Sequence, residues 1–394
     1  MWFQPKRYFP RKRHPLRSAD HMSHLWIKCL APQSFPSQPT KSPIPIAIAP
    51  QDANELRVVH QQMSHKHHLP NVTIFATGGT IAATAASAAV TMGYKSGDIG
   101  IEALIDAVPQ IRTVANIQGI QVMNIDSTEV TAKDLISLAR RAQQEVSSPH
   151  CDGLVITHGT DTLEESAFFV DLTVQTDKPI VFVGAMRPAT IISADGPLNL
   201  LEAVTLAASP KARGRGVLVT LNDRIGSAFL TSKMHANSVD AFRASEGGYL
   251  GFFFDVQPRF FYAPSLPLGR HYFSAFDLPD ELPQVEILYS YQGFNPRLAE
   301  AAVKMGAKGL VLAGPGYGTW RKAGRMENAR LVEQYNTQIV TASQNGDGFA
   351  ISQGGRNNYG AGHLNPRKAR IMLQLGLAQG YDSEKLEKLF SFDC

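Results

Sequence analysis

From residue 71 onward, short apolar runs alternate with segments in which apolar residues recur at helical spacing. The apolar runs are β-branched and flanked by Gly or Pro, which predicts buried strands rather than helices. We expect strands over 72–76, 154–157, 180–183 and 217–221, and helices over 100–107, 162–172 and 196–207. A further helix is expected after Thr131, with Asp134 three positions on as the start signal. This alternation predicts a doubly wound, mostly parallel α/β sheet.

A proline-punctuated polar stretch interrupts the alternation, and we expect a linker over residues 276–284. Strands and helices then resume, which predicts a second, smaller C-terminal α/β domain over 285–394. Its strands are expected over 285–289, 309–313 and 338–341, and its helices over 297–305, 325–334 and 366–376. The larger N-terminal catalytic domain is expected over 71–275. In such sheets ligands bind at the carboxyl ends of the strands.

Residues 1–70 differ in composition from the rest of the chain. They hold ten Lys or Arg against three acidic residues, a net +7, so the remaining chain carries −3 of the total +4. We expect a disordered basic leader. The net charge of the remaining chain gives no electrostatic reason to expect nucleic-acid binding, and no apolar stretch is long enough for a membrane span. Absence of a signal peptide favours the cytoplasm, with mitochondrial or secreted locations as alternatives.

The three cysteines, Cys29, Cys151 and Cys394, lie far apart and show no CxxC spacing. Neither a disulfide framework nor a zinc site is expected. No cluster of ligands for a metal or organic cofactor is visible, so we expect the protein to need none.

The segment Thr77-Gly-Gly-Thr-Ile-Ala82 directly follows the first expected strand. It lacks the GxGxxG spacing of a dinucleotide site, and the chain contains no Gly-Lys pair as in a P-loop. Its two glycines instead allow a sharp backbone turn that presents Thr80 at the edge of the sheet.

A second polar segment, Thr157-His-Gly-Thr-Asp-Thr162, follows the strand over 154–157. Taken alone, Asp161 or Thr162 could simply cap the next helix, and His158 is more often a packed histidine than a base. Lys233 becomes chemically relevant if the fold brings it to Thr160 and Asp161. There its ammonium could lower the pKa of a threonine hydroxyl, or the lysine could act as a base if burial depresses its own pKa.

Five segments in order resemble the type II L-asparaginase/glutaminase family over about residues 70–394. They are Thr77-Gly-Gly-Thr-Ile-Ala82, Leu154-Val-Ile-Thr-His-Gly-Thr-Asp-Thr-Leu-Glu-Glu165, Gly184-Ala-Met-Arg-Pro188, Ser193-Ala-Asp-Gly-Pro197 and Leu364-Asn-Pro-Arg-Lys-Ala-Arg370. The resemblance implies hydrolysis of the side-chain amide of L-asparagine to L-aspartate and ammonia. It also implies a homotetramer in which paired subunits share active sites.

The resemblance implies a role for individual residues. Thr80 matches the nucleophile that forms an acyl-enzyme, and Tyr94 matches a tyrosine on the lid over the substrate. Thr160, Lys233 and Asp161 match a second catalytic triad, whose carboxylate also holds the substrate ammonium. Substrate-binding positions are completed by Ser127, Thr128, Gly79 and Gly159. Elementary chemistry agrees, because a threonine hydroxyl is a poor nucleophile without a neighbour that takes its proton.

Besides Thr128, which stands where the family often has glutamine, the chain departs from the family pattern at three places. Tyr317 stands where many members have an asparagine that completes a neighbouring subunit's site. No glutamate is found between Asp347 and Tyr359 to help bind the ammonium group, and Gln353 is the nearest polar candidate. Thr176 replaces a cysteine of some secreted relatives. The first two changes bear on substrate preference and not on the nucleophile.

Two other functions therefore stay open. One is a glutaminase-asparaginase of broader specificity, which kinetics would distinguish. The other is a catalytically silent homologue that binds an amino acid without releasing ammonia. The joint presence of Thr80, Thr160, Asp161 and Lys233 favours the enzyme, because stability alone does not demand that combination.

Overall fold

The computed structural model describes residues 68–84, 99–267 and 269–392. Its larger sheet has eight strands in the order β10-β9-β6-β5-β4-β3-β1-β2. Five neighbouring strands of this sheet are parallel to one another. They are β1 (Asn71–Gly78), β2 (Asn116–Ile125), β3 (Gly153–Thr157), β4 (Ile180–Val183) and β5 (Val217–Leu221). The doubly wound, mostly parallel sheet predicted from the sequence is thus present.

The strand order places a topological switch point between β1 and β3. From β1 the chain continues outward to the edge strand β2, whereas β3, β4 and β5 extend the sheet the other way. Connections leaving a switch point diverge to opposite sides and leave a crevice at the carboxyl ends of the two strands. A ligand site is therefore expected just after Gly78 and Thr157.

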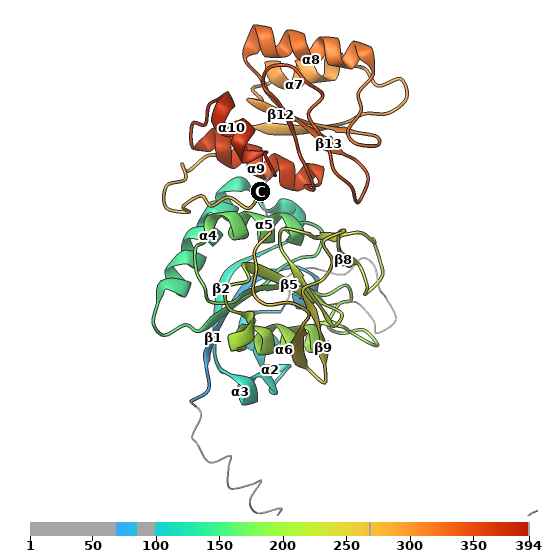
Figure 1. The fold of residues 1–394 in the computed structure, drawn as a ribbon. Helices are drawn as coiled ribbons and strands as arrows, with labels where there is room; N and C mark the ends of the chain where they lie inside the picture. Colours follow the sequence, from blue (N-terminus) through green and yellow to red (C-terminus); the bar gives the residue numbers. More distant parts are fainter. Residues whose placement is uncertain (1–67, 85–98, 268, 393–394) are drawn as a thin grey trace, which may run out of the picture. The chain divides into compact units, whose positions relative to one another are not determined.

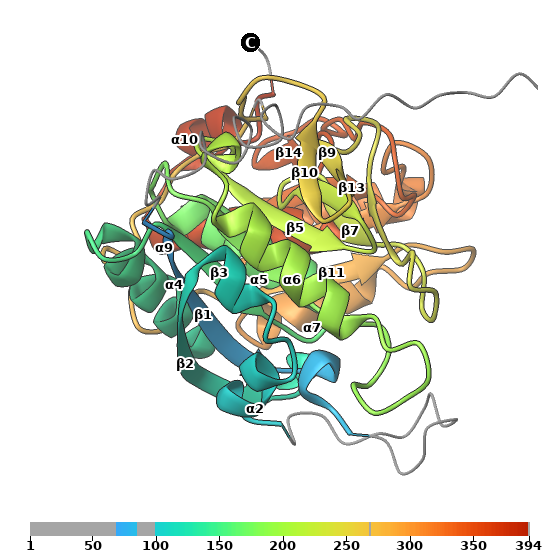
Figure 2. The same ribbon diagram turned by 90° about the horizontal axis from the view of Figure 1, so that it is seen from below.

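Helices cover both faces of the larger sheet (Figures 1 and 2). The first face carries α4 (Ala132–Ser147) and α5 (Leu163–Thr173). The opposite face carries α2 (Ile101–Asp106), α3 (Ile111–Val114) and α6 (Gly196–Ala207). The start signal read from the sequence is confirmed for α4, because Thr131 and Asp134 form a reciprocal capping box.

The second sheet contains four parallel strands in the order β11-β12-β13-β14. These are β11 (Val285–Tyr289), β12 (Gly309–Gly314), β13 (Gln338–Ser343) and β14 (Asn358–Gly360). Its helices are α7 (Arg297–Lys304), α8 (Lys322–Tyr335), α9 (Pro366–Ala378) and α10 (Ser383–Leu389). Helix α9 contacts α5 as well as β11, β12 and β13. One apolar cluster consequently continues from Phe168 on α5 to Leu373 on α9.

Several strands were not anticipated. The edge strand β2 alternates exposed and half-buried residues such as Gln118 and Asn124, so it lacks the apolar run that marked its neighbours. The sheet also continues antiparallel beyond β5 through β6 (Arg224–Ser227), β9 (Gly251–Phe254) and β10 (Gln257–Phe260). A separate two-stranded ribbon joins β7 (Thr231–Lys233) to β8 (Phe242–Ala244).

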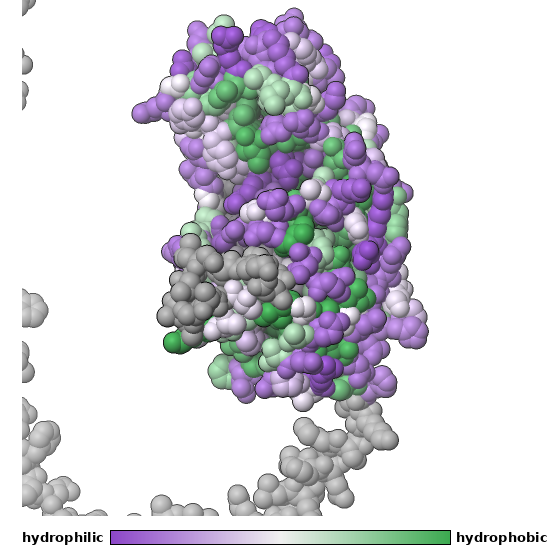
Figure 3. Space-filling model, turned by 180° about the vertical axis from the view of Figure 1, so that it is seen from behind, coloured by the Kyte–Doolittle hydropathy of each residue, from purple (hydrophilic) through white to green (hydrophobic). Residues whose placement is uncertain are grey.

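Hydrophilic residues dominate the face of the molecule seen in Figure 3, with hydrophobic residues in small patches between them. Within the ranges that the structure describes, no helix is long and apolar enough to cross a membrane.

Candidate active site

The end of β1 is a tight turn that places Thr80 in the interior. Gly78 and Gly79 have φ values of 103° and 82°, in the region that favours glycine. Thr80 follows as the first residue of a single 3₁₀ turn (Thr80–Ala82) and is 6% exposed. The turn thus delivers a hydroxyl side chain at the carboxyl edge of the sheet, as its glycines predicted.

Three chain segments meet at this edge. A methyl group added to Gly79 would lie 2.3 Å from the Cα of Gly159, and one added to Gly159 would lie 2.8 Å from the Oγ of Ser127. Ser127 is buried and opens the short turn that follows β2. The turns after β1, β2 and β3 are therefore in van der Waals contact, with Thr80 and Thr160 each next in sequence to one of the touching glycines.

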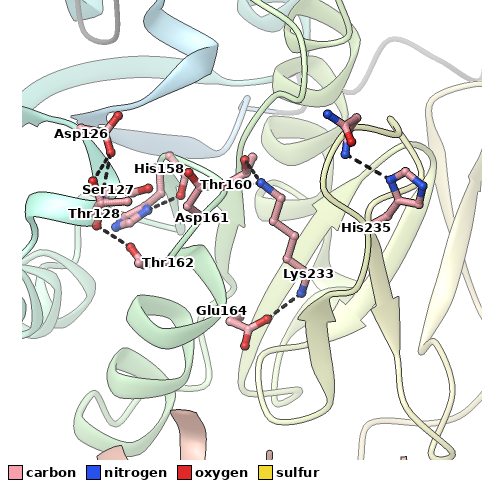
Figure 4. Close-up of polar contacts among 12 residues, drawn as sticks. Asp126, Ser127, Thr128, His158, Thr160, Asp161, Thr162, Glu164, Lys233 and His235 are labelled. Carbon is pink, nitrogen blue, oxygen red and sulfur yellow. Dashed lines mark hydrogen bonds and ion pairs between the residues drawn. The ribbon is translucent and has the colours of Figure 1, made fainter. Parts of the chain in front are cut away.

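The structure brings Lys233 to the turn after β3 (Figure 4). Its ammonium donates hydrogen bonds to Thr160 Oγ1 at 3.0 Å and to Asp161 Oδ1 at 2.6 Å. The Lys233 side chain is 12% exposed, whereas that of Asp161 is 61% exposed. A mostly buried ammonium thus contacts a buried hydroxyl on one side and an accessible carboxylate on the other. This arrangement polarises the hydroxyl of Thr160 and leaves Asp161 within reach of a cationic ligand.

Neither Asp161 nor Thr162 caps α5 with its side chain. Thr162 occupies the N-cap position, yet its side chain accepts no hydrogen bond from the helix. Its hydroxyl instead donates to the backbone carbonyl of Ser127 at 2.6 Å. Capping alone is therefore wrong as an explanation of this segment. The bond ties the turn after β3 to the turn after β2.

Thr128 has a different environment from Ser127. It is exposed, and its backbone N–H and its hydroxyl both donate to Asp126 Oδ1, at 2.9 and 2.7 Å. Asp126 thereby caps the short turn that holds Ser127 in its buried position.

His158 is packed in the interior, in keeping with the structural interpretation of this residue. Its side chain is 1% exposed, and its Nδ1 lies 2.8 Å from the carbonyl oxygen of Gly159. Burial lowers its pKa from 6.5 to about 4, against the opposing influence of that carbonyl and of Asp126. The imidazole is consequently neutral near pH 7, and the short contact requires its proton on Nδ1.

The other predicted positions are Tyr94, Tyr317 and Gln353. Tyr94 lies outside the described residues. Tyr317 is 54% exposed. Gln353 lines a cavity of about 310 Å³ that Trp320 and Arg356 also border and that lies wholly within the C-terminal residues. Across the described ranges, no group of three His, Cys, Asp or Glu side chains is arranged to hold a metal ion.

Glu164 was not singled out from the sequence. It is fully buried in the first turn of α5, and its Oε2 accepts a 2.6 Å hydrogen bond from the backbone N–H of Lys233. The only signal was its place inside the second motif, since sequence does not reveal which of two adjacent glutamates is buried.

Two sequence profiles together match most of the chain. Residues 71–266 match the N-terminal domain of asparaginases, and residues 284–390 match the glutaminase/asparaginase C-terminal domain. With the two α/β sheets described above, they define the class as a two-domain α/β amidohydrolase.

Individual relatives specify the family. The chain is 49% identical to "Probable L-asparaginase 3" of Schizosaccharomyces pombe over 84% of its own length and 91% of the relative's. It is 41% identical to "Glutaminase-asparaginase" of Pseudomonas fluorescens biotype A, covering 84% and 92%. The crystal structure of a "Probable Cytoplasmic L-asparaginase" from Campylobacter jejuni superposes with a TM-score of 0.77 at 39% identity, covering 82% and 99%. The chain belongs to the asparaginase family.

Proposed function

We propose that this protein hydrolyses the side-chain amide of L-asparagine to L-aspartate and ammonia, with Thr80 as the nucleophile. The observation that carries the proposal is the contact of Lys233 with both Thr160 and Asp161, beside the turn that presents Thr80. Family membership indicates the class of reaction. The contact of Lys233 provides a polarised hydroxyl on Thr160 and leaves the Asp161 carboxylate accessible, which suits that reaction.

Charges at the site complement an α-amino acid. The accessible carboxylate of Asp161 attracts an α-ammonium group. The hydroxyl of Ser127, the substrate-contacting residue expected from the family, would donate to the α-carboxylate. Thr128, whose two donors are engaged by Asp126, would border the same group from the exposed side of the turn. Held by its α-ammonium and α-carboxylate groups at one end, the substrate would direct the side-chain amide at its other end toward Thr80, across Gly79 and Gly159.

The reaction would proceed in two halves. Thr80 Oγ1 adds to the amide carbon while its proton passes to a neighbouring base. The base then gives this proton to the amide nitrogen, so that the C–N bond breaks and ammonia leaves. A water molecule next attacks the Thr80 ester, which releases L-aspartate and restores the hydroxyl. Thr160, hydrogen-bonded to the Lys233 ammonium, would position the attacking oxygen and relay its proton. Tyr94 would orient the nucleophile. No metal or organic cofactor enters this scheme.

The same proposal extends to assembly and location. Paired subunits of a homotetramer would complete one another's sites, with Tyr317 and Gln353 as the residues of this chain that replace the usual asparagine and glutamate. A cytoplasmic location is proposed in line with the Campylobacter jejuni protein, described as a probable cytoplasmic enzyme.

A broader glutaminase-asparaginase is the second candidate, favoured by the 41% identity to a relative of that name. Steady-state ammonia release from L-asparagine and L-glutamine by the purified full-length protein tests both. A kcat/KM at least about tenfold higher for L-asparagine is expected, since one methylene changes binding by roughly 1–3 kcal/mol. Equal values would establish the broader enzyme. Aspartate binding without ammonia release from either substrate would refute both and leave the silent homologue.

A further inference from the structure

The catalytic lysine is held by a buried network that reaches it from the C-terminal helix α9. The network begins at Lys368, which is 1% exposed. Its ammonium donates to the carbonyl oxygens of Phe229 at 3.0 Å and Thr231 at 2.7 Å, and it lies 5.8 Å from the ring centroid of Phe168. An ammonium with carbonyl partners in the interior is costly to bury, and this burial lowers the pKa of Lys368 to about 8. Close packing alone would be served better by an apolar side chain.

The two carbonyl groups that Lys368 contacts belong to the segment that leads to Lys233. Phe229 and Thr231 precede Lys233 by four and two residues, and Thr231 opens the strand β7 that Lys233 ends. The partner strand of β7 is the equally short β8. A three-residue strand in a two-stranded ribbon is a weak support by itself. Lys368 therefore fixes the backbone from which Lys233 extends.

A second arm of the network runs through Glu164. Its Oε2 accepts from the backbone N–H of Lys233 at 2.6 Å. Its Oε1 accepts from Asn365 Nδ2 at 3.1 Å and pairs with Arg367 Nε at 2.9 Å. Asn365 Nδ2 also donates to Ser232 Oγ at 3.0 Å. The start of α9 therefore contacts β7 in two ways, directly through Asn365 and Ser232 and indirectly through Glu164. Glu164 itself lies four residues after Thr160.

We infer that Lys368 of α9 and the N-cap residue Asn365, together with Glu164, are positioning residues that set the reach of Lys233 to Thr160 and Asp161. The two catalytic partners come from different elements, Thr160 from the turn before α5 and Lys233 from β7. Glu164 joins these elements directly, and Lys368 joins β7 to the C-terminal domain. A displacement of about 1 Å at a reacting group costs roughly 100-fold in rate. The expected changes in kcat rest on the proposed function. The expected change in the distance between Lys233 and Thr160 rests on geometry alone.

Lys368→Met in the full-length protein is the first test, because methionine fills a similar volume without the ammonium. Its kcat for L-asparagine is expected to fall about 10- to 100-fold, with a smaller change in KM. The matched control Lys385→Met removes an exposed lysine of α10 and should leave kcat unchanged.

A double-mutant cycle separates positioning from general destabilisation. If Lys368 acts through Lys233, adding Lys368→Met to a Lys233→Met protein should cause no further loss. Equal losses in both backgrounds would overturn the inference. If Lys368→Met does not fold, Ser232→Ala decides, because it removes one Asn365 contact without disturbing a buried charge. An about fivefold fall in kcat is expected there, and an unchanged kcat would overturn the inference.

A crystal structure of Lys368→Met, or of Ser232→Ala where Lys368→Met does not fold, gives a readout independent of activity. The Lys233 Nζ to Thr160 Oγ1 distance is expected to exceed 3.5 Å, against 3.0 Å in the parent protein. An unchanged distance would refute positioning. Should the parent protein release no ammonia, the proposed function fails while this structural test still stands.

Discussion

The backbone of Gly79 packs directly against that of Gly159, so closely that a β-carbon on Gly79 would lie 2.3 Å from both the Cα and the N of Gly159. Real side chains do not approach backbone atoms at this distance, and backbone is not free to move aside. The contact fixes the spacing between the turn that carries Thr80 and the turn that carries Thr160.

Gly79→Ala should therefore separate the two turns. We expect a loss of at least about 100-fold in kcat, because misplacement near 1 Å has that effect. Gly354→Ala is the matched control, since Gly354 has nearly the same φ of 81° and no atom within 4 Å of an added β-carbon. Similar losses in the two variants, measured by ammonia release, would show that backbone strain and not the contact matters.

Thr80→Ala tests the nucleophile. Turnover should fall at least about a thousandfold, as for nucleophile removal in other covalent hydrolases, while the far-ultraviolet dichroism and melting temperature stay near those of the parent. Retained turnover would remove Thr80 from the mechanism. Thr113→Ala, which removes an exposed threonine hydroxyl of α3, serves as the comparison and should leave turnover unchanged.

Lys233→Met removes the ammonium that contacts Thr160 and Asp161. A fall in kcat of about a thousandfold or more is expected, because the hydroxyl loses its charged partner. Thr160→Val should give a loss of the same size, and the double variant should be little worse than either single variant. Additive losses would indicate that the two residues act independently, contrary to the proposal.

The buried His158 predicts a loss of stability in acid. Its pKa in the folded state is about 4, below the ordinary 6.5. Between these values the unfolded chain binds a proton that the folded chain does not, so the free energy of unfolding decreases as pH falls from 6.5 toward 4. The effect is about 3 kcal/mol over the whole window. Denaturant unfolding of His158→Gln should show a weaker acid dependence, whereas substitution of the exposed His150 should leave it intact.

Glu202 on α6 predicts a pH dependence of stability opposite in sign to that of His158. Burial, followed by its interaction with Asp223, raises its pKa from 4.5 to about 8. The folded chain then holds a proton that the unfolded chain releases, so this contribution to stability decreases as pH rises from 4.5 to 8. Glu202→Gln should flatten that part of the stability profile. The exposed Glu333→Gln should not, and an unaltered slope in Glu202→Gln would contradict the assignment.

Sequence patterns predicted the parallel core of this fold well, because buried strands such as β3 and β12 are uninterrupted apolar runs. They did not reveal β2, whose faces are both partly exposed, or the antiparallel extension beyond β5, whose strands are short and rich in glycine and phenylalanine. Burial is a property of the assembled chain, so a mixed face leaves no clear period in the sequence.

The residues of the candidate site were likewise predicted only in part from the sequence. Thr80 and Thr160 were found because each follows a strand. Lys233 was noted as a candidate, and the resemblance supplied the expectation that it meets Thr160 and Asp161. The supporting residues Glu164 and Lys368 lie within recognised motifs, yet nothing local distinguishes a buried charge from a solvated one. Their partners are distant in the chain, 69 residues away for Glu164 and Lys233. Only the folded structure reveals such pairings.

The apolar cluster that runs from Phe168 to Leu373 predicts how the two halves of the chain would behave if they were separated. Cutting the polypeptide between the two sheets would expose the inner surfaces of α5 and α9 to water, at a cost of about 25 cal/mol for each Å² of apolar area. Neither fragment, produced alone, should remain monodisperse in solution. Calorimetry of the intact chain should accordingly record one endotherm, with both halves melting together.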